Sequence, residues 1–188
     1  GSSTWQAEEI ALLEAQRFAI NQGIDCRLLL VPRHVERAHE ILKLLKSQDL
    51  AWSQRSKYHN PNDNLYIHLA DTTGELAYLT QAADIAFIGK SLPPNKGGQT
   101  PIEAASAGIP IIMGSEMNNF RDISKKLVSS GAAKTVNDAN DLVKVVAELA
   151  TNSIALAGMR NAAVQWHKLN RGSSERIASH IRESLLGH

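Results

Sequence analysis

The sequence Gly-Gly-Gln-Thr-Pro-Ile-Glu occupies residues 97–103 and lies between two short apolar runs, residues 85–89 and residues 109–114. Glycines let the backbone turn, and proline followed by an acidic residue is typical of the first turn of a helix. We therefore expect a strand, a loop, a helix and a second strand. In α/β proteins this arrangement suits a phosphorylated nucleoside, because free amides at the helix start face the anion.

Individual residues of this stretch have predicted roles at such a site. Gly97 and Gly98 would let the backbone approach an anion, and Thr100 would add a hydroxyl. Glu103, one turn into the helix, would bind a ribose diol. A structural explanation is also open, since Thr100 as N-cap, Pro101 at the first helical position and Glu103 form a capping box. The two explanations are compatible, so capping does not argue against a ligand.

Apolar runs and helical patterns alternate along the rest of the chain. Strands and helices at this spacing predict a Rossmann-like α/β fold, a three-layer α/β/α arrangement with a mainly parallel sheet. Residues 53–64 are rich in Asn, Pro and Ser and predict a loop or short edge strand. The predicted strands are 26–31, 65–69, 85–88, 109–113 and 133–136, and the predicted helices are 8–19, 35–46, 74–82, 101–107, 120–129, 139–150, 154–168 and 174–186.

The start of the chain departs from this pattern. A doubly wound domain opens with a central strand, whereas Gly-Ser-Ser-Thr at residues 1–4 leads straight into the predicted helix, with Ser3 or Thr4 as its cap. We expect the first strand to lie outside this chain, as a piece of a longer protein. The strands beside the vacant position would then have exposed edges and pair in trans.

Composition predicts one globular domain over residues 1–188, because 43% hydrophobic residues are enough for a substantial core. The 20 Lys and Arg residues nearly balance the 19 Asp and Glu residues, and basic and aromatic residues do not alternate, so nucleic acid is not an expected partner. A single cysteine, Cys26, favours a reducing, cytoplasmic compartment. The seven histidines lack the spacing of metal ligands, so no metal site is expected.

The sequence Pro32-Arg33-His34 follows a predicted strand, at the carboxyl end where open α/β sheets bind ligands. The planar guanidinium of Arg33 would hold a phosphate or a base carbonyl. Alternatively, Arg33 pairs with Glu36 or Glu40 within a turn.

Short motifs follow one another in a fixed order along nearly the whole chain: Ser3-Thr4-Trp5 before Glu8-Glu9, Pro32-Arg33-His34 before Glu36-Arg37, Ala70-Asp71-Thr72 before Gly74-Glu75-Leu76, residues 83–89 before Ser91-Leu92, the loop 97–103, Met113-Gly114, Asn119-Phe120 and Asn170-Arg171-Gly172. In this order they resemble the carboxyl-terminal half of the Kdo transferases. These enzymes transfer 3-deoxy-D-manno-octulosonic acid (Kdo) from CMP-Kdo to the lipid A precursor in lipopolysaccharide biosynthesis.

The resemblance implies a GT-B glycosyltransferase, in which two Rossmann-like domains face each other across a cleft. This chain would be the donor-binding half, and the amino-terminal, acceptor-binding domain would be absent from it. Arg33 and Ser3 or Thr4 would lie near the phosphate and cytidine of CMP-Kdo. Gly89 and Ser91 would line the donor pocket.

The same resemblance implies that Gly97 and Gly98 present amides, that Glu103 binds the ribose and that Asn119 approaches the sugar. Such enzymes are inverting transferases that use neither a bound metal nor a cofactor. Their general base belongs to the amino-terminal domain, which also holds the lipid A precursor. We therefore expect no catalytic residue in this chain. The chain alone should bind CMP-Kdo weakly and should not transfer Kdo. The full-length protein would act at the cytoplasmic face of the inner membrane.

Two positions depart from the family pattern. The family usually has His-Asn where this chain has Gln99-Thr100, and Gly-Gly-Ser where it has Gly89-Lys90-Ser91. A related 3-deoxy-ulosonic acid donor is therefore one alternative. Others are a GT-B half of a glycosyltransferase or epimerase that uses a UDP- or GDP-sugar, and a non-catalytic sugar-nucleotide-binding domain.

Overall fold

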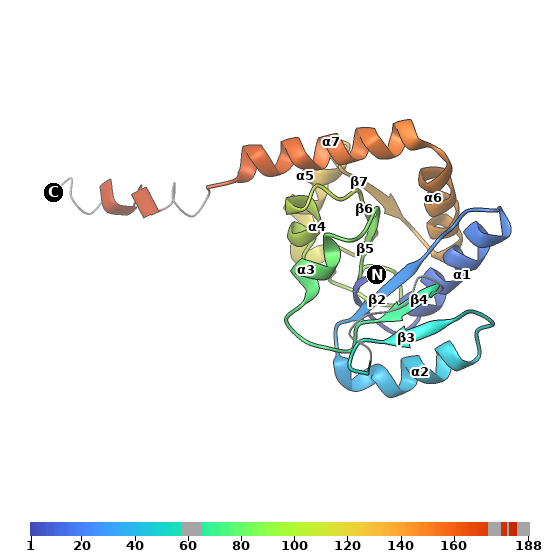
Figure 1. Ribbon diagram of the computed structural model, residues 1–188. Helices are drawn as coiled ribbons and strands as arrows, with labels where there is room; N and C mark the ends of the chain where they lie inside the picture. Colours follow the sequence, from blue (N-terminus) through green and yellow to red (C-terminus); the bar gives the residue numbers. More distant parts are fainter. Residues whose placement is uncertain (58–64, 173–177, 180, 184–188) are drawn as a thin grey trace.

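The computed structural model describes residues 1–57, 65–172, 178–179 and 181–183, and its strands form one parallel sheet in the order β3-β4-β2-β1-β5-β6-β7 (Figure 1). This is the Rossmann-like α/β fold that the sequence predicts. The strands are β1 (Ser2–Thr4), β2 (Leu28–Pro32), β3 (Trp52–Gln54), β4 (Ile67–Leu69), β5 (Ala86–Ile88), β6 (Ile111–Gly114) and β7 (Ala133–Val136).

Helices cover both faces of the sheet (Figure 1). One apolar cluster joins α1, α2 and α6 to one face, and a second joins α4, α5 and α7 to the other. The helices are α1 (Glu8–Asn21), α2 (Ala38–Lys46), α3 (Leu76–Thr80), α4 (Ile102–Ser106), α5 (Arg121–Ser129), α6 (Ala139–Thr151) and α7 (Ser153–Asn170), with short 3-10 helices η1 (Val35–Arg37) and η2 (Asn118–Phe120).

Side chains of the central strands alternate between these two clusters. Phe87 packs with α1 and α6, whereas its neighbours Ala86 and Ile88 pack with α4 and α5. Ile112 and its neighbours in β6 divide in the same way. Because successive residues of a strand point to opposite faces, a short apolar run serves two cores. This explains why the strands appear in the sequence as continuous apolar runs.

Strand β1 corrects the sequence prediction. We expected the chain to enter a helix directly and its first strand to lie outside it, but Ser2–Thr4 form a short strand in the central position. The N–H groups of Val31 and Gly89 donate to Gly1 O and Ser2 O at 2.9 and 2.8 Å. Three residues without an apolar pattern are too few for periodicity to identify. Pairing in trans was expected because this position seemed vacant, and β1 occupies it.

Where the structure describes them, the remaining elements agree with the prediction to within a few residues, apart from the cap at the start of α1. The predicted caps Ser3 and Thr4 are wrong, because α1 begins at Glu8 after Ala7 and has no side-chain cap. The stretch 53–64 contains edge strand β3, which begins at Trp52, and residues 58–64 lie outside the described ranges. Most of the predicted closing helix, 174–186, also lies outside them.

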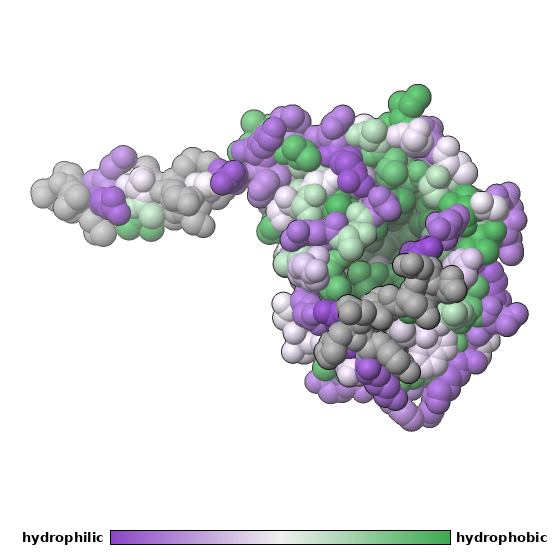
Figure 2. All heavy atoms as spheres, in the orientation of Figure 1, coloured by the Kyte–Doolittle hydropathy of each residue, from purple (hydrophilic) through white to green (hydrophobic). Residues whose placement is uncertain are grey.

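The face drawn in Figure 2 carries hydrophobic side chains around a central hollow and many hydrophilic ones at its rim. A cavity of about 280 Å³ lies at the amino ends of the strands, between α1 and α6. No single helix in the described ranges has the length and apolar character needed to cross a bilayer, although α6 and α7 together, bent by 99°, meet that criterion.

Candidate functional site

The loops that follow β1 and β5 open side by side at the carboxyl edge of the sheet. The chain passes from β1 to β2 on one side, and the β4–β5 connection then crosses to the other, so the order reverses between β1 and β5. Ligands of open parallel sheets bind at such a reversal. We call this region the switch crevice, and define it by residues 5–7, residues 89–101 and the corner Arg33-His34.

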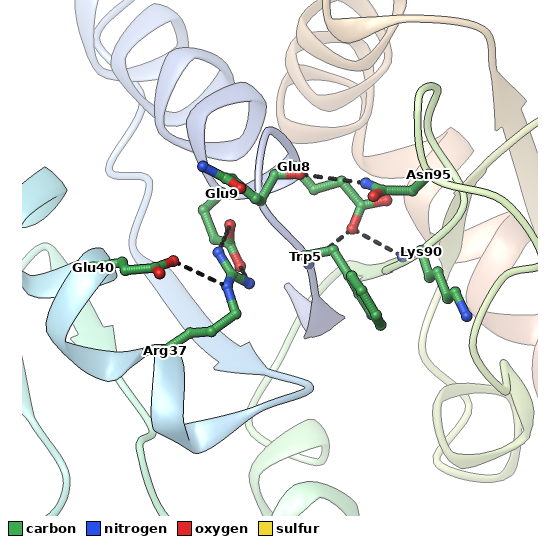
Figure 3. A network of polar contacts seen from close by, with 8 residues as sticks. Trp5, Glu8, Glu9, Arg37, Glu40, Lys90 and Asn95 are labelled. Carbon is green, nitrogen blue, oxygen red and sulfur yellow. Dashed lines mark hydrogen bonds and ion pairs between the residues drawn. The ribbon is translucent and has the colours of Figure 1, made fainter.

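The carboxylate of Glu8 ties the two loops together. Glu8 is 1% exposed and accepts the N–H groups of Ser91 and Leu92 at 2.9 and 3.1 Å. It also accepts the N–H groups of Trp5 and Lys90 at 3.0 and 2.8 Å (Figure 3). Burial raises the pKa of Glu8, and these N–H groups act in the opposite direction. The amides at the base of the switch crevice therefore already have an anionic partner, supplied by the chain itself.

Backbone strain is concentrated in the same place. Among the described residues, the non-glycine positions with positive φ are Ser3, Ala7 and Lys90, with φ of 54°, 72° and 58°. Ser3 is the middle residue of β1, and the other two lie in the loops of the switch crevice. Residues held in such conformations cost about 1–3 kcal/mol each and cluster at functional sites. The strain thus supports the crevice as the candidate site.

An aromatic and cationic cluster forms the rim of the switch crevice. The ring of His34 meets the ring of Trp5 edge-on, with centroids 5.1 Å apart, and Lys90 Nζ lies 5.0 Å from the centroid of the Trp5 ring. Cations are attracted to the face of an indole in this way. Lys90 thus brings a positive charge to the crevice from the loop after β5.

Arg33 is exposed at the end of β2, and its N–H donates to Thr4 O at 3.0 Å. The alternative pairing of Arg33 with Glu36 or Glu40 is wrong, because among the described residues neither carboxylate lies within the 4.0 Å of an ion pair with Arg33, and Glu40 instead accepts a hydrogen bond from Arg37 Nε at 3.3 Å (Figure 3). Arg33 therefore lies beside β1, where an anion in the crevice would meet its guanidinium.

The ion pair between Glu9 and Arg37 lies behind the switch crevice. Glu9 is 2% exposed, and its two oxygens accept from Arg37 Nη1 and Nη2 at 3.0 and 3.1 Å (Figure 3). The hydrogen bond to Glu9 raises the pKa of Arg37, against the effect of burial. Sequence reasoning noted Glu8 and Glu9 only as motif residues. The sequence signal that could have identified these two residues is a pair of adjacent acidic residues at the start of a largely buried helix.

The glycine loop differs from the prediction in how its amides are used. Gly97 N–H donates to Glu116 O at 3.1 Å, and Gly98 N–H donates to Lys90 O at 2.8 Å. The expectation that these amides face an anion is therefore wrong. The glycines are needed for other reasons. Their φ values are 105° and 72°, and added Cβ atoms would lie 2.7 Å from Asn119 Nδ2 and 2.4 Å from Met117 Sδ.

The start of α4 is only half capped. Thr100 Oγ1 accepts the N–H of Ile102 at 3.2 Å, while Pro101 stands before the first helical residue rather than at it. The reciprocal half of the predicted capping box is absent, because Glu103 Oε2 is buried without a hydrogen-bond partner. A buried carboxylate oxygen without a donor is costly, and the hydroxyls of a ligand would supply one.

Two predicted pocket residues lie beneath the surface. Ser91 is 0% exposed, and its hydroxyl donates to Ile88 O and accepts the N–H of Gly114 at 2.7 Å. Thr4 is also 0% exposed. The Ser91 hydroxyl is thus occupied by contacts within the chain, contrary to the prediction, whereas Thr4 Oγ1 is buried without a hydrogen-bond partner. Gly89 is required by close packing, since a Cβ there would lie 2.1 Å from Ser3 O.

Backbone hydrogen bonds bring the remaining predicted residues together. Gln99 N–H donates to Gly89 O at 3.0 Å, which joins the glycine loop to the end of β5. Asn119 N–H donates to Gly97 O at 2.9 Å, which places the exposed Asn119 against the loop. No group of three or more His, Cys, Asp or Glu side chains able to hold a metal occurs in the part of the chain that the structure describes.

Comparison with known proteins finds relatives that share one name. The chain is 32% identical over 185 residues to the 3-deoxy-D-manno-octulosonic acid transferase of Haemophilus influenzae, covering 98% of this chain and 43% of that enzyme. It is 31% identical over 186 residues to the enzyme of the same name from Bordetella pertussis, covering 98% and 42%. The chain thus spans less than half the length of these curated relatives, which bear the name of the family that the motifs resemble.

A solved structure of a CMP-Kdo binding domain is also similar to this chain. The C-terminal CMP-Kdo binding domain of WaaA from Acinetobacter baumannii matches with a TM-score of 0.81 and 26% identity, over 90% of this chain and 86% of that one. The family model described as glycosyl transferases group 1 matches residues 8–166. Because this match covers most of the chain, including strands β2 to β7, the chain belongs to the glycosyl transferases group 1 family.

Proposed function

We propose that this chain is the donor-binding half of a glycosyltransferase that transfers Kdo from CMP-Kdo to a lipid A precursor. Support comes from the relatives named Kdo transferases and from the likeness to a CMP-Kdo binding domain. The switch crevice supplies the geometry, with the cations Arg33 and Lys90 at its rim and a helix start beside its glycine loop.

Within this proposal, the nucleotide lies across the carboxyl ends of β1, β2 and β5. Arg33 and Lys90 face its phosphate, and Ser3 is the residue of β1 within reach. Glu103 takes the ribose diol, with Thr100 adding a hydroxyl. Gly97 and Gly98 shape the loop and hold Asn119 in place, rather than donating amides to the anion.

The chemistry proposed for this half is stabilisation of a leaving group. As the bond between Kdo and CMP breaks, negative charge grows on the CMP phosphate, and fixed cations stabilise such charge. Arg33 and Lys90 would do so without a metal or cofactor. The general base and the lipid A precursor would belong to the part of the relatives that this chain does not span. The complete enzyme would work at the cytoplasmic face of the inner membrane.

The observation that carries the donor assignment is the buried, unpartnered oxygen of Glu103. A ribose has two adjacent hydroxyls that donate to a carboxylate, whereas 2′-deoxyribose has one. Comparing CMP with 2′-deoxy-CMP therefore isolates the contact. We expect the wild-type chain to prefer CMP by about tenfold in calorimetry, a typical value for a hydrogen bond to a charged group.

The Glu103→Ala variant should bind the two nucleotides equally, whereas Glu14→Ala, which removes an exposed acid from α1, should keep the wild-type preference. An unchanged preference in Glu103→Ala would remove Glu103 from the ribose site. Tighter binding of UDP or GDP than of CMP would instead favour a half-enzyme for a diphosphate sugar. CMP-Kdo binding without transfer, even after an amino-terminal half is supplied, would favour a non-catalytic domain.

A further inference from the structure

A groove of about 540 Å³ lies at the carboxyl ends of β6 and β7, separate from the residues proposed to hold CMP. One face of α5 forms its floor, because Arg121, Ser124, Lys125 and Val128 follow the spacing that places side chains on one side of a helix. Met117 closes the end nearest the switch crevice. We call this region the α5 groove.

A buried hydroxyl in the α5 groove has no partner. Ser124 is 7% exposed, and its Oγ makes no hydrogen bond. Serines in helices can satisfy themselves by donating to a carbonyl one turn back, as Thr80 does with Leu76 O in α3. Ser124 does not do so. Buried polar groups without partners are rare, so a hydroxyl that lines a groove is suited to a ligand atom.

Two cations at the α5 groove also lack acidic partners. Neither Arg121 nor Lys125 has a carboxylate oxygen within the 4.0 Å of an ion pair, as far as the described residues extend. Arg121 Nη2 donates only to Asn118 Oδ1, at 3.0 Å, and Asn118 Nδ2 donates to Glu116 Oε2 at 3.2 Å. No acidic side chain lines the groove itself. The groove therefore carries a net positive charge.

We propose that the α5 groove binds a phosphate monoester. Such a group carries a charge of about −1.5 to −2 at neutral pH and has three acceptor oxygens, which matches two cations and a hydroxyl better than a single carboxylate does. The phosphate is held between Arg121 and Lys125 and accepts a hydrogen bond from Ser124. The apolar side chains of Met117 and Val128 face whatever the phosphate is attached to.

This inference goes beyond the donor site and does not depend on it. The two sites share one wall, since Met117 lines the α5 groove and also packs against Gly98. No residue proposed to contact CMP lines the groove. A variant of the groove floor should therefore change phosphate binding and leave CMP binding intact, so that failure of either assignment is seen separately.

The test is an NMR titration of the labelled chain with inorganic phosphate, glucose 1-phosphate and n-octyl phosphate. We expect amide shifts concentrated at residues 113–129 and 135. Arg121→Gln and Lys125→Gln should each weaken binding about fivefold, within the range of a charge-assisted hydrogen bond. Lys126→Gln is the matched control, because it removes the same charge from α5 at an exposed position outside the groove.

The Ser124→Ala variant separates binding from folding. Removing an unpartnered buried hydroxyl should leave the melting temperature unchanged or raise it, whereas phosphate affinity should fall. Tighter binding of n-octyl phosphate than of the other two would assign an amphipathic phosphate, and equal binding of all three would assign phosphate alone. Absence of shifts at α5 with all three probes, or equal affinity of Lys125→Gln and Lys126→Gln, would overturn the proposal.

Discussion

Glu8 shows how a single side chain fixes the candidate site. Its carboxylate collects four N–H groups from two loops that are more than 80 residues apart in sequence, at separations of 82, 83 and 84 for the contacts to the second loop. A phosphate would use such amides in many nucleotide-binding loops. Here they are occupied, so we expect a ligand to meet the side chains of Arg33, which is exposed, and Lys90, which is half-buried.

Replacing Glu8 with Gln should destabilise the protein by about 2–3 kcal/mol. Each Glu8 oxygen accepts two N–H groups, so the amide NH₂ of Gln would face donors whichever way it turns. Urea unfolding measures the loss. Glu14→Gln, at an exposed position of the same helix, should stay within about 0.5 kcal/mol of the wild type. Equal stability of the two variants would show that the carboxylate is not needed.

Ala7 offers a second prediction, of opposite sign. Its φ of 72° places a Cβ in the left-handed region, and the residue is exposed, so Ala7→Gly removes strain without losing packing. We expect a gain of about 1 kcal/mol in the free energy of unfolding. Ala157→Gly, at an exposed position within α7, should lose about 1 kcal/mol. A loss of stability in both variants would mean that Ala7 is not strained.

The sequence identified the glycine loop but not the partners of its amides. Glycine at residues 97 and 98 indicates an unusual backbone, which the positive φ values confirm. Which acceptor takes each N–H depends on Lys90 and Glu116, which are close only once the sheet has formed. Glu8 was missed for the same reason, because an acid in a first helical turn is ordinarily explained by the helix dipole.

At the level of secondary structure, the ion pair between Glu9 of α1 and Arg37 of η1 joins two elements across the back of the switch crevice. Arg37→Ala would leave the buried Glu9 carboxylate without its bidentate partner. We expect a loss of about 3 kcal/mol, measured by chemical unfolding. Arg27→Ala is the control, because its pair with Asp25 is exposed on both sides and should contribute less than about 1 kcal/mol.

The paired strands β3 and β4 at the edge of the sheet contain His68, and its titration should make the stability of the protein depend on pH. Ser53 Oγ and His68 Nδ1 lie 2.7 Å apart, and burial lowers the pKa of His68, with the charge of Arg55 acting in the same direction. Between the lowered folded pKa and the unfolded value of about 6.5, the unfolded chain binds more protons, so stability falls as pH falls. Thermal unfolding from about pH 7.5 to 5.5 should show this trend.

The same scan on His68→Gln isolates the histidine. Its stability should change less over that pH interval than the stability of the wild type. An identical slope in both proteins would assign the pH dependence over this interval to groups other than His68. Hydrogen bonds from Gln54 and Ser56 lower the pKa of Asp71 despite burial, so its contribution is lost at more acidic pH.

Most elements were predictable because each has either a helical apolar pattern or a short apolar run. Strand β1 was not, since Ser2–Thr4 has neither. Its position is fixed by long-range pairing with Val31 and Ile88, which no local signal reveals. The motif set nevertheless identified the family correctly, because order along the chain carries information that a single element does not.

For the molecule as a whole, the central prediction is a separation of binding from transfer. Within the proposed function, the chain alone should bind CMP and produce no Kdo-lipid product from CMP-Kdo and a lipid A precursor. Addition of the amino-terminal half of a relative, such as the Haemophilus influenzae enzyme, should restore transfer. Radiolabelled Kdo incorporation measures both. Transfer by the chain alone would contradict the assignment of the base to the other half.

The central position of β1 also bears on how the protein forms during synthesis. One contact of this region, from Ser91 N–H to the Glu8 carboxylate, spans 83 residues. At about 5–20 residues per second, the ribosome takes roughly 4–17 s to make the intervening chain. During that interval β1 and the Glu8 carboxylate lack their partners in β5 and its loop. Completion of β5 is therefore the step that commits the nascent chain to its sheet, and a pause placed before Ile88 would prolong exposure to chaperones and proteases.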